Sequence, residues 1–103
     1  MVTTERRKSP RYKFDGALGI SWGGAVLSGR VLEIGADGMF VEMSNPLWIG
    51  AAFSAQLAAE KPILLNCVVR WIEPNRGMGV SIVAPGEENR RRFAAFVDML
   101  SGG

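Results

Sequence analysis

Arginines near the N-terminus are the side chains of this sequence best suited to binding chemistry. Arg6 and Arg7 precede a short segment that ends in Pro10, and Arg11 follows it. Because Pro10 disfavours a continuing helix, we expect Arg7 and Arg11 on an extended or turning linker. A guanidinium group matches a phosphate or the O6/N7 edge of guanine, and it also stacks on a base. Two arginines at this spacing predict a ligand with phosphates and guanines; the alternative is a basic tail with no fixed ligand.

A second candidate segment covers residues 33–38 and directly follows an expected strand. Its sequence, EIGADG, places a carboxylate before a tight turn that ends in glycine. Such a turn can present backbone N–H groups and an acceptor at the end of a strand. Glu33, Gly35 and Gly38 are therefore candidate binding residues, and an ordinary hairpin turn is the alternative.

The composition excludes most catalytic and metal chemistry. The 103 residues include no histidine and one cysteine, which excludes histidine-based catalytic pairs, histidine-ligated metals, multi-cysteine zinc sites and an internal disulfide. The acidic residues are scattered over expected turns and helix ends, so we expect no catalytic carboxylate pair. Cys67 falls on the inward face of an expected strand, where it is interpreted as a small buried apolar residue. We therefore expect no enzyme, no catalytic residue and no metal site.

Charge is distributed unevenly along the chain. Residues 1–13 carry a net charge of +4 and the rest carries −2, which gives the overall +2. A basic head predicts an anionic partner. The acidic body without a ladder of exposed aromatics disfavours general DNA or RNA binding. No apolar run reaches the length of about 18 residues that spans a bilayer, and no apolar stretch follows the N-terminal charges, so we expect a cytoplasmic protein without membrane insertion.

Three consecutive arginines, Arg90, Arg91 and Arg92, fall early in an expected C-terminal helix. At 3.6 residues per turn their side chains spread over about 200°, so they cannot form one focused patch. A solvated helix face is the simple interpretation, and help to a nearby anion site or partner is the alternative.

Six short apolar segments separated by glycine and proline predict an all-β domain. The Gly23-Gly24 pair predicts a type I′ hairpin turn, since both positions need positive φ. In residues 63–72 the alternation predicts that Ile63, Leu65, Cys67, Val69 and Trp71 face the core. The expected strands cover residues 17–22, 25–34, 39–43, 52–59, 63–72 and 78–83.

The period changes near the C-terminus. Phe93, Phe96, Val97 and Leu100 recur at helical spacing within residues 87–100, which predicts one apolar helix face. The elements together predict a small β-barrel that carries a C-terminal helix. We divide the chain into a basic linker over residues 1–14 and a barrel with its helix over residues 15–103.

These segments, in this order, resemble the PilZ domain family. Residues 7–11 (RKSPR) fit the R-x-x-x-R motif of that family, and Arg6 supplies a common preceding arginine. Residues 29–41 (GRVLEIGADGMFV) align with the [D/N]-x-S-x-x-G motif and its flanks. Residues 68–71 (VVRW) and 77–80 (GMGV) resemble the fifth and sixth strands. The resemblance covers nearly the whole chain and implies a six-stranded antiparallel β-barrel, of the split-barrel type, with a C-terminal α-helix.

The resemblance also implies a ligand, the bacterial second messenger cyclic di-GMP, and no other cofactor. By the family pattern, arginines would bind phosphates and guanine edges while the second motif meets a guanine from the barrel. The implied site consists of Arg6, Arg7, Arg11, Glu33, Gly35 and Gly38.

This sequence departs from the second family motif at two positions. Glu33 stands where aspartate or asparagine is usual, and Gly35 stands where the family has serine. Two functions therefore stay open. One is a receptor that orders its arginine linker around cyclic di-GMP and relays the signal to a bacterial protein partner. The other is a degenerate PilZ domain that does not bind the nucleotide and acts as a protein–protein adaptor.

Overall fold

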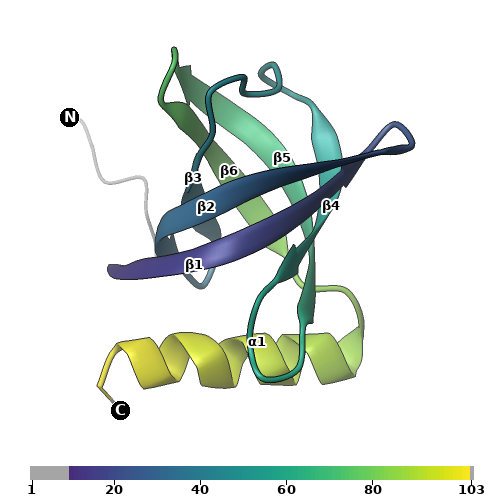
Figure 1. Cartoon of the computed structure of the whole chain (residues 1–103). Helices are drawn as coiled ribbons and strands as arrows, with labels where there is room; N and C mark the ends of the chain where they lie inside the picture. Colours follow the sequence, from purple (N-terminus) through teal and green to yellow (C-terminus); the bar gives the residue numbers. More distant parts are fainter. Residues whose placement is uncertain (1–9, 103) are drawn as a thin grey trace, which may run out of the picture.

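The computed structural model describes residues 10–102 of the chain. Six antiparallel strands form a closed barrel in the order β1-β2-β3-β6-β5-β4, and a helix follows the last strand (Figure 1). The predicted fold is confirmed. The elements are β1 (Arg11–Trp22), β2 (Ala25–Gly35), β3 (Gly38–Glu42), β4 (Ala52–Leu57), β5 (Ile63–Glu73), β6 (Gly77–Val83) and α1 (Gly86–Leu100).

The β1–β2 hairpin turns at the predicted glycine pair. Gly23 has φ 56° and Gly24 has φ 82°, as a type I′ turn requires. The predicted start of the first strand at residue 17 is wrong, because β1 begins at Arg11. Residues 11–14 therefore lie in the barrel and not in a linker ahead of it. Half-buried Tyr12 and Phe14 alternate with exposed Lys13 and Asp15, as in a strand. The high charge of this segment is the reason why it was predicted to be a linker.

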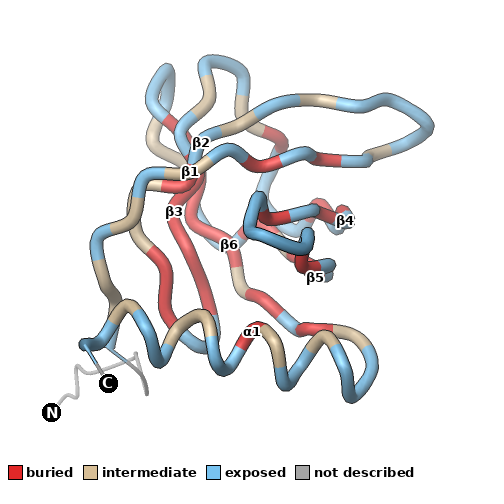
Figure 2. Tube along the Cα trace, turned by 60° about the horizontal axis from the view of Figure 1, so that its bottom comes forward, coloured by how far each residue is buried: buried red, intermediate tan, exposed pale blue. Residues whose placement is uncertain are grey.

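Buried residues alternate with exposed ones along much of the strands (Figure 2), and apolar side chains of the buried residues form the core. Ile63, Leu65, Cys67 and Val69 face this core as predicted. Trp71 does not, and that prediction is wrong: a register shift between Val69 and Trp71 in the β5–β6 pair moves the indole to the outside, where it is 39% exposed. A β-bulge of this kind adds one residue to a strand and so reverses the face of every residue after it.

Helix α1 lies across one end of the barrel (Figure 1). Phe93 is buried, and Phe96, Val97 and Leu100 pack partly buried against the core, as the helical spacing predicts. Phe96 meets Phe14 of β1 edge to face, with ring centroids 5.0 Å apart. The helix therefore buries its apolar stripe against the same part of β1 that carries Arg11. Within residues 10–102, no helix combines the length and the hydropathy of a membrane-spanning segment.

Candidate functional site

Arg11 and the β2–β3 turn form the centre of the candidate site. Arg11 is the first residue of β1 and pairs with Gly35 at the end of β2. Its side chain lies over the turn and is only 11% exposed. An ideal Cβ on Gly38 would lie 2.6 Å from Nη2 of Arg11. The fold therefore seats the guanidinium directly against the turn that follows β2.

Glu33 contacts the same guanidinium. Its Oε1 lies 3.7 Å from Nη1 of Arg11, and its side chain is 42% exposed. Lys13 is the cross-strand partner of Glu33 in the β1–β2 register. Two cationic residues of β1 therefore flank a single carboxylate of β2, and Asp37 adds a second carboxylate in the turn.

Gly35 and Gly38 are required here by space and not by a left-handed backbone. Neither has positive φ, whereas Gly23 and Gly24 do. A Cβ on Gly35 would overlap the carbonyl oxygen of Pro10, and one on Gly38 would lie 2.8 Å from the carbonyl oxygen of Val80. Both glycines therefore allow backbone and Arg11 to approach the turn more closely than any side chain would permit.

The structure brings Arg11, Glu33, Gly35 and Gly38 together at one rim of the barrel. Arg6 and Arg7 lie outside the described residues. The four described candidates come from two segments that are more than 20 residues apart in sequence, and the β1–β2 pairing is what joins them.

Further polar and aromatic groups lie along β3, β5 and β6 beyond this turn, and the sequence did not single them out. Ser81 of β6 is the cross-strand partner of Gly38, and its Oγ accepts a hydrogen bond of 3.1 Å from Nε of Arg70. Phe40 is the partner of Glu33. The guanidinium of Arg76 lies 4.8 Å from the Phe40 ring centroid, so this ring is covered by a cation.

The indole of Trp71 completes this outer face. It covers Gly79, where an ideal Cβ would overlap the ring, and its centroid lies 6.4 Å from that of Phe40. With its 39% exposure, Trp71 offers an aromatic surface beside arginine side chains. The signal in the sequence was the Arg70-Trp71 pair, but alternation alone assigned Trp71 to the core because the bulge is not visible in the pattern.

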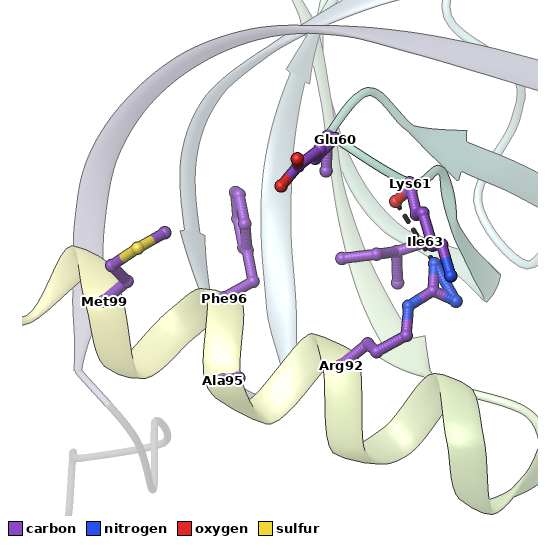
Figure 3. Close-up of a pocket in the computed structure, with 8 residues that line it drawn as sticks. Glu60, Lys61, Ile63, Arg92, Ala95, Phe96 and Met99 are labelled. Atoms are coloured by element: carbon purple, nitrogen blue, oxygen red, sulfur yellow. Dashed lines mark hydrogen bonds between the residues drawn. The ribbon is translucent and has the colours of Figure 1, made fainter.

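A separate cleft of about 720 Å³ lies between α1 and the β4–β5 connection (Figure 3). Ile63, Ala95 and Phe96 give it an apolar floor, and Met99 stands at one end. Nη2 of Arg92 donates to the carbonyl oxygens of Lys61 and Pro62, which ties the helix to the connection. No residue of the 33–38 turn lines this cleft.

The three consecutive arginines of α1 diverge, as their spacing predicts. Arg92 binds the β4–β5 connection, and Arg91 pairs with Glu88 at 3.1 Å. Arg90 lines a second cleft between α1 and Ala36 of the β2–β3 turn. They therefore do not form one anion-binding patch.

The described residues offer little for nucleophilic or metal chemistry. Burial raises the pKa of the Cys67 thiol from 9.0 to about 12, so the thiol is protonated and inert at neutral pH. No group of three His, Cys, Asp or Glu side chains in residues 10–102 is placed to hold a metal ion. The rim around Arg11 presents a guanidinium, Lys13 and the carboxylates of Glu33 and Asp37, and a guanidinium suits binding of a phosphate or of a guanine edge.

Comparison with solved structures supports the fold. Seventeen chains of solved structures match, although a search of curated proteins finds no match. The PilZ domain of CeSA from a cellulose-synthesizing bacterium is 15% identical, with a TM-score of 0.73 over 90% of this chain and 99% of that domain.

Two longer proteins are also similar. MotI/DgrA, an inhibitor of motility from Bacillus subtilis, is 17% identical with a TM-score of 0.74 over 93% of this chain and 51% of its own. MrkH from K. pneumonia, solved as a complex with c-di-GMP, is 16% identical with a TM-score of 0.77 over 94% of this chain and 52% of its own. This chain thus spans about half the length of these two relatives. The PilZ domain model matches residues 5–98, and the chain belongs to the PilZ domain family.

Proposed function

We propose that this chain is a receptor module for cyclic di-GMP and not an enzyme. The observation that carries the proposal is the position of Arg11, whose guanidinium lies against Gly38 and beside Gly35 at the turn of the second family motif. The MrkH complex with c-di-GMP supports the choice of ligand. In this proposal Arg11 binds phosphate or guanine from the barrel rim, and Arg6 and Arg7 close over the ligand from the N-terminal side.

The ligand would change the surface that the domain shows to a protein partner. Closure of the arginine segment over the ligand would form a new surface next to the start of β1, and the protein partner would bind that surface. We place the module in the bacterial cytoplasm, where the nucleotide is made, and we propose no DNA or RNA target.

Isothermal titration calorimetry with cyclic di-GMP tests this proposal. The wild-type chain is expected to bind, and Arg7→Ala and Arg11→Ala are each expected to weaken binding at least about tenfold, which is the loss of about 1.4 kcal/mol. Arg91→Ala is the matched control, because Arg91 is an exposed arginine that pairs with Glu88 on α1. Absence of heat at high micromolar nucleotide would refute the receptor function.

An adaptor without nucleotide is the second candidate, and the turn itself favours it. Glu33 already occupies one side of the Arg11 guanidinium, and the Pro10 carbonyl occupies the space that a side chain at residue 35 would need. Affinity capture of the same bacterial protein with and without cyclic di-GMP would support the adaptor. Nucleotide binding gained only in the double variant Glu33→Asp/Gly35→Ser, with the fold checked by circular dichroism, would show that the natural sequence had lost it.

A further inference from the structure

Gly38 and Ser81 lie side by side on the outer face of the barrel. They are cross-strand partners, and opposed residues of an antiparallel pair point to the same face, with Cβ atoms about 4.5–5.5 Å apart. The adjacent pair, Met39 and Val80, is buried in the core, which places Gly38 and Ser81 on the outside. An ideal Cβ on Gly38 would lie 2.6 Å from Nη2 of Arg11. The Arg11 guanidinium therefore occupies the outer face next to Ser81.

Arg70 reaches Ser81 from the opposite side. It belongs to β5, and β6 lies between β3 and β5 in the barrel. Nε of Arg70 donates a hydrogen bond of 3.1 Å to Oγ of Ser81, which leaves the donors of Nη1 and Nη2 for a ligand. The ion pairs found within residues 10–102 all use other arginines, so no carboxylate there neutralises Arg70. Arg11 and Arg70 therefore present two guanidinium groups on one face, with Ser81 between them.

A groove of about 380 Å³ begins at Arg70 and Ser81 and crosses the outer face of β4, β5 and β6. Its side chains come from two neighbouring cross-strand rows and combine a guanidinium, an amide, hydroxyls and apolar groups: Arg70, Asn66, Ser54, Ser81, Val68 and Val83. None of the described residues that line it carries a carboxylate. An apolar surface with a few polar groups suits a planar base, which packs on the apolar part and makes hydrogen bonds at its edge.

The spacing of the strands fits one nucleotide. Gly38 of β3 and Arg70 of β5 are separated by β6, which is two strand spacings or about 10 Å. A nucleotide spans a separation of this order from its phosphate to the far edge of its base. A ligand whose phosphate lies at Arg11 can therefore bring the edge of an attached base to Arg70.

We infer that Arg70 is a further ligand-binding residue and that one guanine of cyclic di-GMP lies in this groove; the inference rests on the proposed receptor function. Arg11 holds a phosphate over Gly38, the nucleotide crosses Ser81, and Nη1 and Nη2 of Arg70 donate to O6 and N7 of the guanine. Ser81 positions the guanidinium by accepting from Nε. Adenine carries an amino group where guanine has O6, so Arg70 selects guanine.

Calorimetric titration of the whole chain with cyclic di-GMP and with its 7-deazaguanine analogue tests this inference. Arg70→Ala is expected to weaken cyclic di-GMP binding at least about tenfold, because a bidentate contact to guanine is lost. The analogue has a C–H group in place of N7, so the wild-type chain is expected to bind it more weakly than cyclic di-GMP. Arg70→Ala should bind the two nucleotides about equally.

Two further variants test the positions of the groups. Ser81→Ala removes the acceptor of Nε but no charge, and we expect a loss of affinity smaller than that of Arg70→Ala. Arg91→Ala is the matched control, since it removes one exposed arginine that pairs with Glu88 on α1. Circular dichroism checks that each variant is folded.

The outcomes separate this inference from the receptor function. A wild-type chain that does not bind cyclic di-GMP refutes both. A wild-type chain that binds, together with an Arg70→Ala variant that binds as tightly, refutes only the role of Arg70. An equal loss in Arg91→Ala would show that only overall charge matters, and equal wild-type affinity for the two nucleotides would show that no donor reaches N7; either result overturns the inference.

Discussion

Nη1 of Arg11 lies 3.7 Å from Oε1 of Glu33, across the pairing of β1 with β2. The two side chains differ in exposure: the arginine is 11% exposed and the glutamate 42%. The carboxylate therefore reaches solvent while the guanidinium is enclosed against the turn. A ligand phosphate that binds Arg11 must compete with Glu33 for the same donors, so Glu33 limits how strongly Arg11 can hold an anion.

Glu33→Gln removes this competition. If the receptor proposal holds, the variant is expected to bind cyclic di-GMP several-fold more tightly than the wild type in calorimetry. The free energy of unfolding should change by less than about 1 kcal/mol, because an ion pair with an exposed partner contributes little to stability. Weaker nucleotide binding in Glu33→Gln would show that the carboxylate binds the ligand and does not oppose it.

Arg11→Lys separates charge from shape. Lysine keeps one positive charge but loses the planar fork that makes two parallel hydrogen bonds to phosphate or guanine. We expect nucleotide affinity close to that of Arg11→Ala and well below the wild type, measured by the same titration. Affinity equal to the wild type would mean that Arg11 contributes only charge.

Gly35→Ser restores the serine of the family motif, but the new side chain has no room beside the backbone of Pro10. The added Cβ overlaps the carbonyl oxygen of Pro10, and a main-chain neighbour cannot rotate away. We expect a loss of about 1–3 kcal/mol in chemical denaturation, as for other overpacked sites. Gly19→Ser is the matched control, because a Cβ on Gly19 meets nothing within 4 Å. Equal stability of the two variants would contradict this account of Gly35.

Gly79→Ala forces a side chain to move instead. A Cβ there overlaps the indole of Trp71, which is partly exposed and can rotate outward. The expected destabilisation is smaller than for Gly35→Ser, about 1 kcal/mol, measured as a shift in thermal midpoint by circular dichroism. A larger loss than in Gly35→Ser would mean that Trp71 is locked in its position.

Cys67 predicts a dependence of stability on pH. Its pKa is 9.0 when solvated and about 12 in the fold. The unfolded chain therefore loses this proton first as pH rises, so the stability contribution is present below pH 9 and is lost between the two values, at up to about 1.4 kcal/mol per pH unit. Urea denaturation of wild type and Cys67→Ala at about pH 8 and about pH 10 checks this. The wild type should lose more stability than the variant.

The order of the elements could be predicted because local chemistry determines it. Paired glycines with positive φ define the β1–β2 turn, and the change of period near residue 86 defines α1. The start of β1 at Arg11 could not be predicted, since a short segment rich in charged residues has the same composition whether it forms a strand or a linker. Trp71 was assigned to the wrong face for a related reason: a bulge depends on the neighbouring strand and leaves no mark in the alternation.

The candidate site was predicted in part. Arg11, Glu33, Gly35 and Gly38 were identified from residue types and spacing together with the family resemblance, and the β1–β2 pairing brings them together. Their spatial relationship, with the Arg11 side chain laid over two glycines, depends on close packing that no single segment encodes. Ser81 and Arg70 adjoin the turn only through strand pairing, so sequence separation concealed them.

The three tryptophans of the chain occupy two separate settings, and this gives the protein intrinsic fluorescent reporters. Trp71 lies over Gly79 with its ring centroid 6.4 Å from that of Phe40, while Trp22 and Trp48 meet edge to face. Emission from a variant that keeps only Trp71 would report changes around Gly79, and emission from a Trp71→Phe variant would report changes around Trp22 and Trp48. Two variants can thus follow the two regions separately without a label.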